Sequence, residues 1–442
     1  MATLICFAVF GAAIAASLIG NWPLVCPIWL GILLFTWLGK KRDIPLQTMW
    51  HDAWRQCRKM CTVLPFYVLI GCMTGLWRSG GTIAFFIYYG TRMIRPGWFI
   101  LVTFLLTSLI SYALGTSFGV VGTAGIILMA LGRSGGVDPA LTAGTILSGA
   151  YFGDRCSPAS SSAALVAAAT GTELRDNLKM MRRTGWLPLL VTTAAYTVLS
   201  LTHPITGMEG SLLSDLAGSF HLSLWAALPA LVMIVLPLCR VSVRLSMALS
   251  AACAFLVTVF LQGAGIPEAL RIAVMGYHPA AGALQQVLSG GGMISMVECS
   301  AIAVSTGLYA GLLGSVGALD GIRAVVRRLA EKTGVFPATA AAYLLIALTF
   351  CNQSTGAVMT PQLVEDIYRD RSVDYGELAI DMENSGIVMS PLVPWNISAS
   401  IPLMMLEVGA AAIPYAVLLY VIPLCYGLTK THFYSQKECE RI

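Results

Sequence analysis

The chain contains few charged residues. Only 11% of its 442 residues are Asp, Glu, Lys or Arg, against about 25% in soluble domains, and 57% are hydrophobic. Its mean hydropathy is +0.77. So little charge leaves no room for a soluble domain or a nucleic-acid-binding surface. It predicts an all-α polytopic membrane protein whose surroundings are the lipid bilayer.

The sequence also lacks the motifs of an intramembrane enzyme. Its five histidines lie mostly in predicted loops without an HExxH pair, and Ser157 has no histidine at membrane depth to activate it. The twelve cysteines are scattered without a CxxC pair, which indicates small buried hydrophobic residues. The first twenty residues lack the basic segment of a signal peptide, so a retained first span is expected.

Two similar stretches each interrupt a long apolar run. Residues 145–171 and 380–409 both contain Gly-x-x-x-Ser-Pro, at Ser157-Pro158 and Ser390-Pro391, followed by a polar turn. Proline cannot continue a regular helix, and freed backbone groups inside a bilayer must be covered by protein or line a wet cavity. Paired interruptions of this kind are typical of the binding site of a secondary transporter.

The apolar runs predict ten membrane spans. The spans cover residues 2–20, 24–39, 61–90, 137–171, 186–202, 224–239, 246–263, 292–319, 374–408 and 411–428. Two further segments, 97–132 and 336–368, carry a polar cluster at their middle. We interpret both as re-entrant hairpins with the cluster at the tip; a single kinked span is the alternative for each.

Positive charge is distributed unevenly over this layout. With a cytoplasmic amino terminus, 21 of the 27 Lys and Arg residues fall on the cytoplasmic side and 4 on the outer side, while Arg78 and Arg155 lie within membrane segments. Lys and Arg concentrate in cytoplasmic loops, and a full span in place of either hairpin would destroy the asymmetry. The distribution predicts a multi-pass plasma-membrane protein with both termini in the cytoplasm.

The layout contains two inverted-topology repeats, each with a hairpin and a broken helix. Each repeat has two spans, a surface amphipathic stretch (43–60 or 264–290), a further span, the hairpin, the broken span and a last span. In such folds the binding site lies between the repeats near the midplane. The predicted units are repeat 1 with spans 1 to 5 at 1–202, an outer linker at 203–223, repeat 2 with spans 6 to 10 at 224–428, and a cytoplasmic tail at 429–442.

Four segments resemble the NhaC-type Na⁺/H⁺ antiporter family, which belongs to a superfamily of elevator-like carriers. They are 71–77 with 81–90, GAYFGDRCSP at 149–158, CNQSTGAVMTPQL at 351–363 and ENSGIVMSPLVPWN at 383–396. The likeness spans nearly the whole chain. It implies a secondary carrier that exchanges cations for protons or, as in other members, exchanges organic acids such as malate and lactate.

Two positions depart from the family pattern. The pattern has an aspartate at the position of Ser161, and it has Glu-Asp-Ser-Gly where this chain has Glu383-Asn384-Ser385-Gly386. Two carboxylates that the resemblance implies near the ion site are therefore neutral here, while Asp154 and Glu383 remain. The number of coupled ions is expected to depend on this difference.

Proton coupling requires an intramembrane acid that titrates in the working pH range. The candidates are Glu383, Asp154, Glu298 and Asp381. Glu383 is predicted to be the principal carrier, the alternative being a salt bridge to Arg78 or Arg155. For Asp154, the alternative to proton coupling is a structural ion pair with the adjacent Arg155. For Glu298, a coupling role and a structural role fit equally well.

The interruptions are rich in the oxygen ligands that hard cations such as Na⁺ prefer. Candidate ligands are Ser157, Ser160, Ser161, Ser162, Asn384, Ser385, Ser390 and Asn396, with a Na⁺ site predicted near Ser157, Ser161, Asn384 and Ser390. Substrate contacts are also predicted for Thr116 and Ser117 at the first hairpin tip and for Asn352, Gln353 and Ser354 at the second. The alternative is that the tip residues only cap the helix ends of their own hairpins.

The sequence therefore favours a Na⁺(cation)/H⁺ antiporter, with exchange of an organic acid or amino acid as the alternative. A passive channel would explain the polar interruptions but not two inverted units of hairpin and broken span. No cofactor is expected, because Na⁺ and H⁺ are the transported or coupling ions. The expected partner is a small ion or small organic anion, and a homodimer stays open.

Overall fold

The structure, a computed structural model, describes an all-α protein. It covers residues 2–20, 22–23, 25–61, 64–93, 95–205, 210–239, 241–279, 283–317 and 322–439. Within these ranges there is no strand, only an isolated bridge between Tyr277 and Gly290. By length and composition, five of the described helices can cross a membrane, or up to seven if each of two bent pairs is one span. The architecture confirms a multi-pass helical membrane protein.

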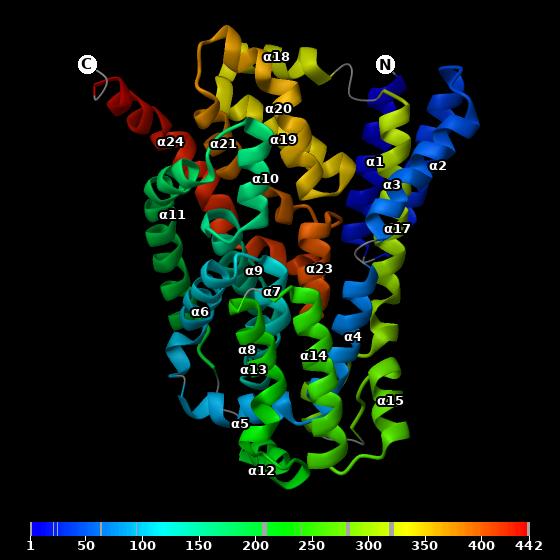
Figure 1. The fold of residues 1–442 in the computed structure, drawn as a ribbon, viewed down its shortest axis with the longest axis vertical. Helices are drawn as coiled ribbons and strands as arrows, with labels where there is room; N and C mark the ends of the chain where they lie inside the picture. Colours follow the sequence, from blue (N-terminus) through cyan, green and yellow to red (C-terminus); the bar gives the residue numbers. More distant parts are fainter. Residues whose placement is uncertain are drawn as a thin grey trace.

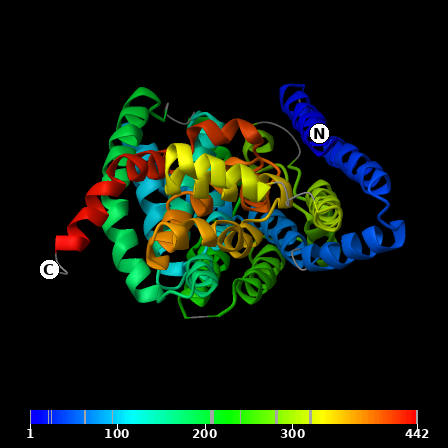
Figure 2. The same cartoon turned by 90° about the horizontal axis from the view of Figure 1, so that it is seen from above.

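The N-terminal helices form one edge of the molecule (Figures 1 and 2). They are α1 (Ala2–Ile19), α2 (Val25–Lys41) and α3 (Leu46–Met60), and α3 occupies the predicted amphipathic stretch. α3 packs along α17 (Val297–Ser315) at Gly311, where a Cβ would lie 2.4 Å from the Ala53 Cα. Glycine at this position lets the two helix backbones come into direct contact.

The predicted span 61–90 is divided in two. α4 (Leu64–Ser79) ends before Gly80, and α5 (Thr82–Met93) starts after Gly81. Gly81 has a φ of +76°, a conformation that glycine adopts without steric cost. α5 then lies at the lower end of the molecule (Figure 1). The predicted span 61–90 thus consists of two helices, because the Gly-Gly pair permits a sharp turn between them.

Both predicted hairpin segments fold back on themselves. The first contains α6 (Phe99–Leu114), α7 (Ser117–Val120), a π-helical turn (Val121–Gly125) and α8 (Ile126–Ser134), and the second contains α19 (Val335–Phe350) and α20 (Gln353–Asp370). A Cβ on Gly132 would lie 3.2 Å from the Phe99 ring, and the hydroxyls of Thr339 and Tyr368 are 2.9 Å apart. The start and end of each segment therefore lie side by side.

The two tips have nearly the same backbone conformation. Gly115 and Cys351 are left-handed, with φ and ψ of 65° and 26° and of 54° and 25°. Thr116 and Asn352 follow with −146° and 123° and with −144° and 123°. Each of these two side chains accepts hydrogen bonds from N–H groups of the next helix. Thr116 and Asn352 therefore do cap their own hairpins.

Each hairpin precedes a broken helix. α9 (Pro139–Cys156) ends at Ser157-Pro158 and α10 (Ser161–Thr170) follows. The second interruption is longer, because α21 (Tyr375–Glu383), α22 (Gly386–Met389) and a 3₁₀ turn (Ser390–Leu392) precede α23 (Ile397–Met405), with a bend of 52°. Ser390-Pro391 therefore lies in a helical turn inside the second interruption, whose extended part comes after it.

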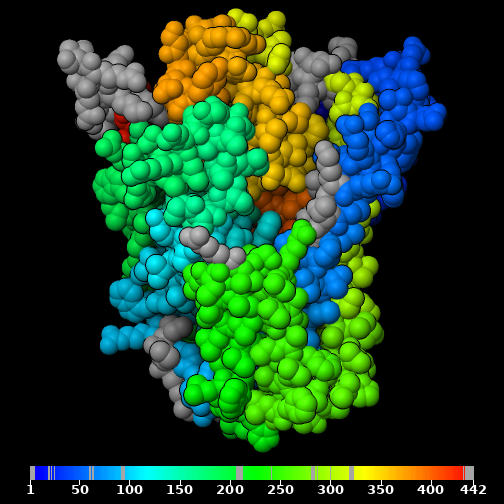
Figure 3. All heavy atoms as spheres, in the orientation of Figure 1, coloured from blue at the N-terminus to red at the C-terminus, as the bar shows by residue number. Residues whose placement is uncertain are grey.

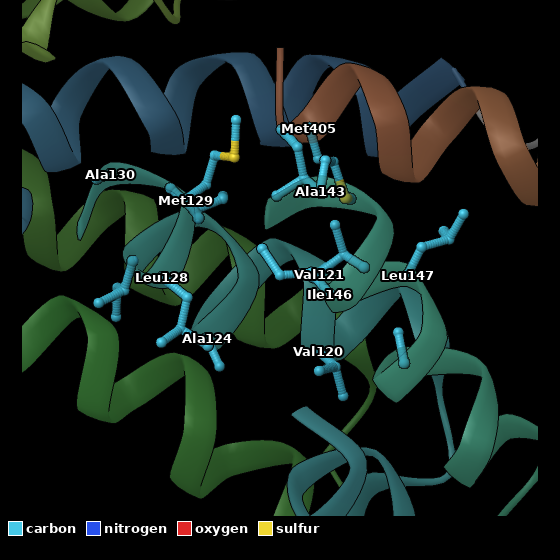
Figure 4. Packing of buried hydrophobic residues seen from close by; sticks show 14 of the residues in the cluster. Val120, Val121, Ala124, Leu128, Met129, Ala130, Ala143, Ile146, Leu147 and Met405 are labelled. Atoms are coloured by element: carbon cyan, nitrogen blue, oxygen red, sulfur yellow. The ribbon is translucent and has the colours of Figure 1, made fainter. Parts of the chain in front are cut away.

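Glycines bring the first hairpin onto the first broken helix. A Cβ on Gly149 would lie 1.9 Å from the Thr107 hydroxyl, and one on Gly153 would lie 2.1 Å from the Ser111 carbonyl carbon. Hydrophobic side chains such as Ile146 fill the core between α9, the second half of the hairpin and α23 (Figure 4). The Gly-x-x-x-Gly spacing at 149–153 thus serves close helix packing.

The remaining helices surround these units. They are α11 (Leu174–Thr202), α12 (Gly210–Ser219), α13 (Leu224–Leu238), α14 (Val243–Leu256), α15 (Ile266–Met275), α16 (Ala283–Leu288), α18 (Ile322–Thr333) and α24 (Val417–Cys439). α12 lies within the predicted linker 203–223, and α15 and α16 lie within the second amphipathic stretch. α3 is in the upper part and α15 at the lower end of Figure 1.

Candidate functional site

The first interruption places Asp154 at the end of α9. The Ser160 hydroxyl donates to the Asp154 carbonyl and accepts from the Ala163 N–H at 3.1 Å, which closes the break. The Ser162 hydroxyl is 3.2 Å from both carboxylate oxygens of Asp154, and the Gln353 side chain from the second hairpin tip also interacts with that carboxylate. Asp154 is only 3% exposed. Oxygen-bearing groups from two separate units thus surround it.

Arg155 joins the two interruptions. Its Nη2 donates to the Asn384 side-chain oxygen, to the Thr184 hydroxyl at 3.0 Å and to the Met181 carbonyl at 3.2 Å. A Cβ on Gly185 would lie 2.9 Å from the guanidinium, so glycine makes room for it. Among the described residues Arg155 forms no ion pair with Asp154. The structural role that the sequence suggested for this adjacent pair is therefore taken instead by Arg155 and Asn384.

Glu383 is a buried acid without a hydrogen bond. It is 0% exposed, and neither carboxylate oxygen has a hydrogen-bond partner among the described residues. Its charged neighbours are Arg155 and Asp154. Arg78, the other partner suggested from the sequence, lies 2.7 Å from Glu407 instead. We call Asp154, Arg155 and Glu383 the buried charge cluster.

Tyr343 packs beside this cluster, between two glycines. A Cβ on Gly386 would lie 1.9 Å from the Tyr343 ring, and one on Gly356 would lie 2.4 Å from it. The Tyr343 hydroxyl donates to the Gln353 carbonyl at 2.8 Å. Gly386 therefore allows the second interruption to press against α19. Tyr343 was not predicted from the sequence, since a lone tyrosine in an apolar run gives no indication of this contact.

Asp381 and Glu298 lie outside the buried charge cluster. The Asp381 carboxylate accepts from the hydroxyls of Tyr368 at 2.6 Å and Tyr426 at 2.8 Å, and from the Lys430 ammonium. Asp381 and Glu383 thus face different surroundings, as their spacing on the helix requires. Glu298 is exposed at the start of α17 and lines a separate cavity of about 430 Å³.

Most of the predicted hydroxyl and amide ligands bond to backbone carbonyls. Ser157 donates to Tyr112 at 2.6 Å and Asn396 donates to Ala347 at 2.9 Å, so each ties its interruption to the first helix of the preceding hairpin. The hydroxyls of Ser385 and Ser390 each donate to the backbone carbonyl four residues earlier in the chain, at 2.6 Å and 2.7 Å. Ser117 is buried, whereas Ser161, at the position of the missing carboxylate, is exposed.

A cavity of about 750 Å³ lies beside the second hairpin tip. Asp52 and Arg55 of α3 line one side, and Asn352 and Ser354 of the tip line another. Figure 3 shows the blue surface of the N-terminal helices to the right of the gold surface of α19 and α20. Because Gln353 interacts with Asp154, the tip lies between this cavity and the buried charge cluster. From the sequence the α3 residues were predicted only to form a surface amphipathic stretch.

Comparison with known proteins identifies the family. A profile of the Na⁺/H⁺ antiporter family matches residues 81–180 and 163–429, which contain both hairpins and both broken helices. The chain belongs to this family. It is therefore a transporter and not an enzyme, and the resemblance seen in its motifs is confirmed.

Relatives of this antiporter are named for different substrates. The Malate-2H(+)/Na(+)-lactate antiporter of Bacillus subtilis (strain 168) is 30% identical over 74% of this chain and 72% of its own length. The Na(+)/H(+) antiporter NhaC of Alkalihalophilus pseudofirmus is 24% identical over 82% and 80%. The Arginine/ornithine antiporter ArcD of Halobacterium salinarum is 27% identical over 74% and 70%.

Proposed function

We propose that the protein exchanges a cation, Na⁺ or one of similar size, for protons at the buried charge cluster. The observation that carries this proposal is the composition of the cluster, which contains two buried carboxylates and one buried guanidinium. An unbalanced charge in a low-dielectric interior is costly. The cluster is therefore neutral only when it holds one more positive charge, either a proton or a metal cation. Because the proton and the metal cation compete for the same charge-balancing position in the cluster, binding of one releases the other. Alternation between the two produces antiport.

The surroundings of the two acids suggest a division of roles. Asp154 has hydroxyl oxygen beside it, at Ser162, which suits a hard cation. Glu383 has no hydrogen-bond partner in the described structure, and a neutral carboxyl is less costly than a carboxylate in such a place. Asp154 is thus the proposed cation ligand and Glu383 the proposed proton carrier. The wider Na⁺ site predicted near Ser157, Ser161, Asn384 and Ser390 stays a prediction.

Alternating access is proposed to occur between two inverted repeats. The matching backbone of the two tips supports the repeat, and the first helix of each hairpin is joined to the broken helix that follows it. The hairpins are proposed to be re-entrant, and both termini to face the cytoplasm from the plasma membrane, because this layout places 21 of 27 Lys and Arg residues inside. A single cysteine introduced at Gly334 tests this orientation. If a thiol reagent reached that cysteine only from outside the cell, the orientation would be wrong.

Exchange of an organic solute is the second candidate function. The cavity of about 750 Å³ is within the range for small organic ligands and far larger than a bare cation needs. Relatives that are named for malate and lactate or for arginine and ornithine support the same alternative.

A flux assay in proteoliposomes tests the first candidate. Na⁺, Li⁺ or K⁺ is applied against a pH gradient, and a dye reports proton movement. Wild type should exchange one of these cations for protons, whereas Asp154→Asn and Glu383→Gln should both fail to do so. Asp176→Asn is the control, because this side chain is exposed on α11. Undiminished cation/proton exchange in either cluster variant would refute the proposal.

A further inference from the structure

The cavity beside the second hairpin tip presents two opposite charges from one face of α3. Asp52, Arg55 and Gln56 are spaced i, i+3 and i+4, which places them on one side of the helix, and all three line the cavity. Among the described residues neither Asp52 nor Arg55 forms an ion pair, with each other or with a third group. A cation and an anion one helical turn apart thus face the same space.

The rest of the cavity wall is mixed in character. The hairpin tip contributes the polar residues Ser354 and Thr355, and α19 and α20 contribute the apolar residues Phe350, Val358 and Met359. A ligand that fits this wall has charged groups at one end and an apolar or weakly polar body at the other. Inorganic cations lack such a body, and an aliphatic acid has no group for Asp52.

We propose that this cavity binds a small organic zwitterion of the amino-acid class, with Arg55 holding the carboxylate and Asp52 the ammonium group. The planar guanidinium of arginine binds carboxylates through paired hydrogen bonds. A hydroxy acid would place no positive charge opposite Asp52, and an amine would place no negative charge opposite Arg55. Both residues together therefore select for a molecule that carries both charges.

The position of the cavity couples such a ligand to the transport machinery. Asn352 and Ser354 line the cavity, while Gln353 between them interacts with Asp154 of the buried charge cluster. A solute that moves the tip would therefore change the contact between Gln353 and Asp154 in the cluster. The inference deepens the second candidate function and rests on the protein being an antiporter.

Binding measurements on the purified full-length protein test the inference. Each common amino acid is titrated by calorimetry, and for the one that binds most tightly the matching 2-hydroxy acid and the decarboxylated amine are titrated too. The amino acid should bind about tenfold more tightly than either analogue, the range expected for hydrogen bonds to charged groups. Arg55→Gln should weaken the amino acid and the hydroxy acid by about tenfold and leave the amine unchanged, whereas Asp52→Asn should weaken the amino acid and the amine only.

Matched controls are available close by. Arg58→Gln on the same helix and Asp43→Asn just before it remove the same charges outside the cavity lining, and both should bind like wild type. Failure of every amino acid to bind, equal effects of the control and cavity variants, or tighter binding of the hydroxy acid would each overturn the inference. Cation/proton exchange is measured separately, so loss of one proposal leaves the other standing.

Discussion

Glu383→Gln should abolish cation/proton exchange, and adding Arg155→Gln to it should restore exchange. In wild type, two carboxylates and one guanidinium leave room for one extra cation. Glu383→Gln leaves the cluster with one carboxylate and one guanidinium, so no proton or metal ion is needed for its net neutrality. The double variant has only Asp154, which again requires a single positive charge and would bind the proton and the metal cation in turn. If replacements merely damaged the site, removing a second charged group would not restore exchange. Recovery in the double variant would therefore support the charge balance.

The size of the effect follows from the buried position of these groups. Two unit charges about 6 Å apart in an effective dielectric of about 20 interact by about 3 kcal/mol. In Glu383→Gln, a cation bound at Asp154 would leave the charge of Arg155 unbalanced. Its binding free energy would be weaker by roughly this amount, which is about a hundredfold in affinity. The double variant removes this penalty. Arg155→Gln alone leaves both carboxylates unbalanced, so it should exchange two charges per cycle instead of one.

Proteoliposomes with a trapped pH dye measure the rates, and the cation gradient that stops proton flux reports the stoichiometry. Melting temperatures in detergent check that the variants fold, and each replacement is an uncharged amide that still reaches into its site. Lys430→Gln combined with Glu383→Gln is the matched control, because Lys430 forms its ion pairs with Glu377 and Asp381, outside the cluster. This control should stay inactive.

The charge count would be refuted by either of two results. One is full cation/proton coupling in Glu383→Gln alone, since that variant has no unbalanced carboxylate. The other is a folded Glu383→Gln, Arg155→Gln variant that still fails to exchange, since the charge balance would then not be what limits coupling.

Other replacements test the surrounding structure. Asn384→Asp adds the carboxylate of the family pattern next to Arg155, so it should raise the number of exchanged cations by one; unchanged stoichiometry in the flux assay would contradict this. Gly386→Ala should destabilise the fold by about 3 kcal/mol, because the new Cβ would overlap the Tyr343 ring, and an unaltered melting temperature would show that the ring can move aside. Glu407→Gln should cost about 2 kcal/mol, because it leaves the buried Arg78 without its anion, whereas Glu268→Gln at an exposed pair should leave the melting temperature unchanged.

The local constraints of a bilayer made part of this protein predictable from its sequence. Apolar runs, Gly-Gly and Ser-Pro interruptions and unequal Lys and Arg placement are each properties of a short segment, because the membrane acts on every segment separately. They predicted a helical membrane protein, which the structure confirms, and they marked the two segments that fold back on themselves and the first break. They also selected Asp154 and Glu383, because an acid inside an apolar run is costly unless it has a role.

The partners of these groups were decided by the tertiary structure alone. Arg155 bonds to Asn384, 229 residues later, and Arg78 pairs with Glu407 instead of Glu383. The charges of α3 face a cavity because this helix packs along α17 and beside the second tip. Such contacts depend on how distant segments cross, which local periodicity does not encode. For this protein the sequence placed Asp154, Arg155 and Glu383 in apolar segments, and packing between distant segments determined which charged groups lie beside one another.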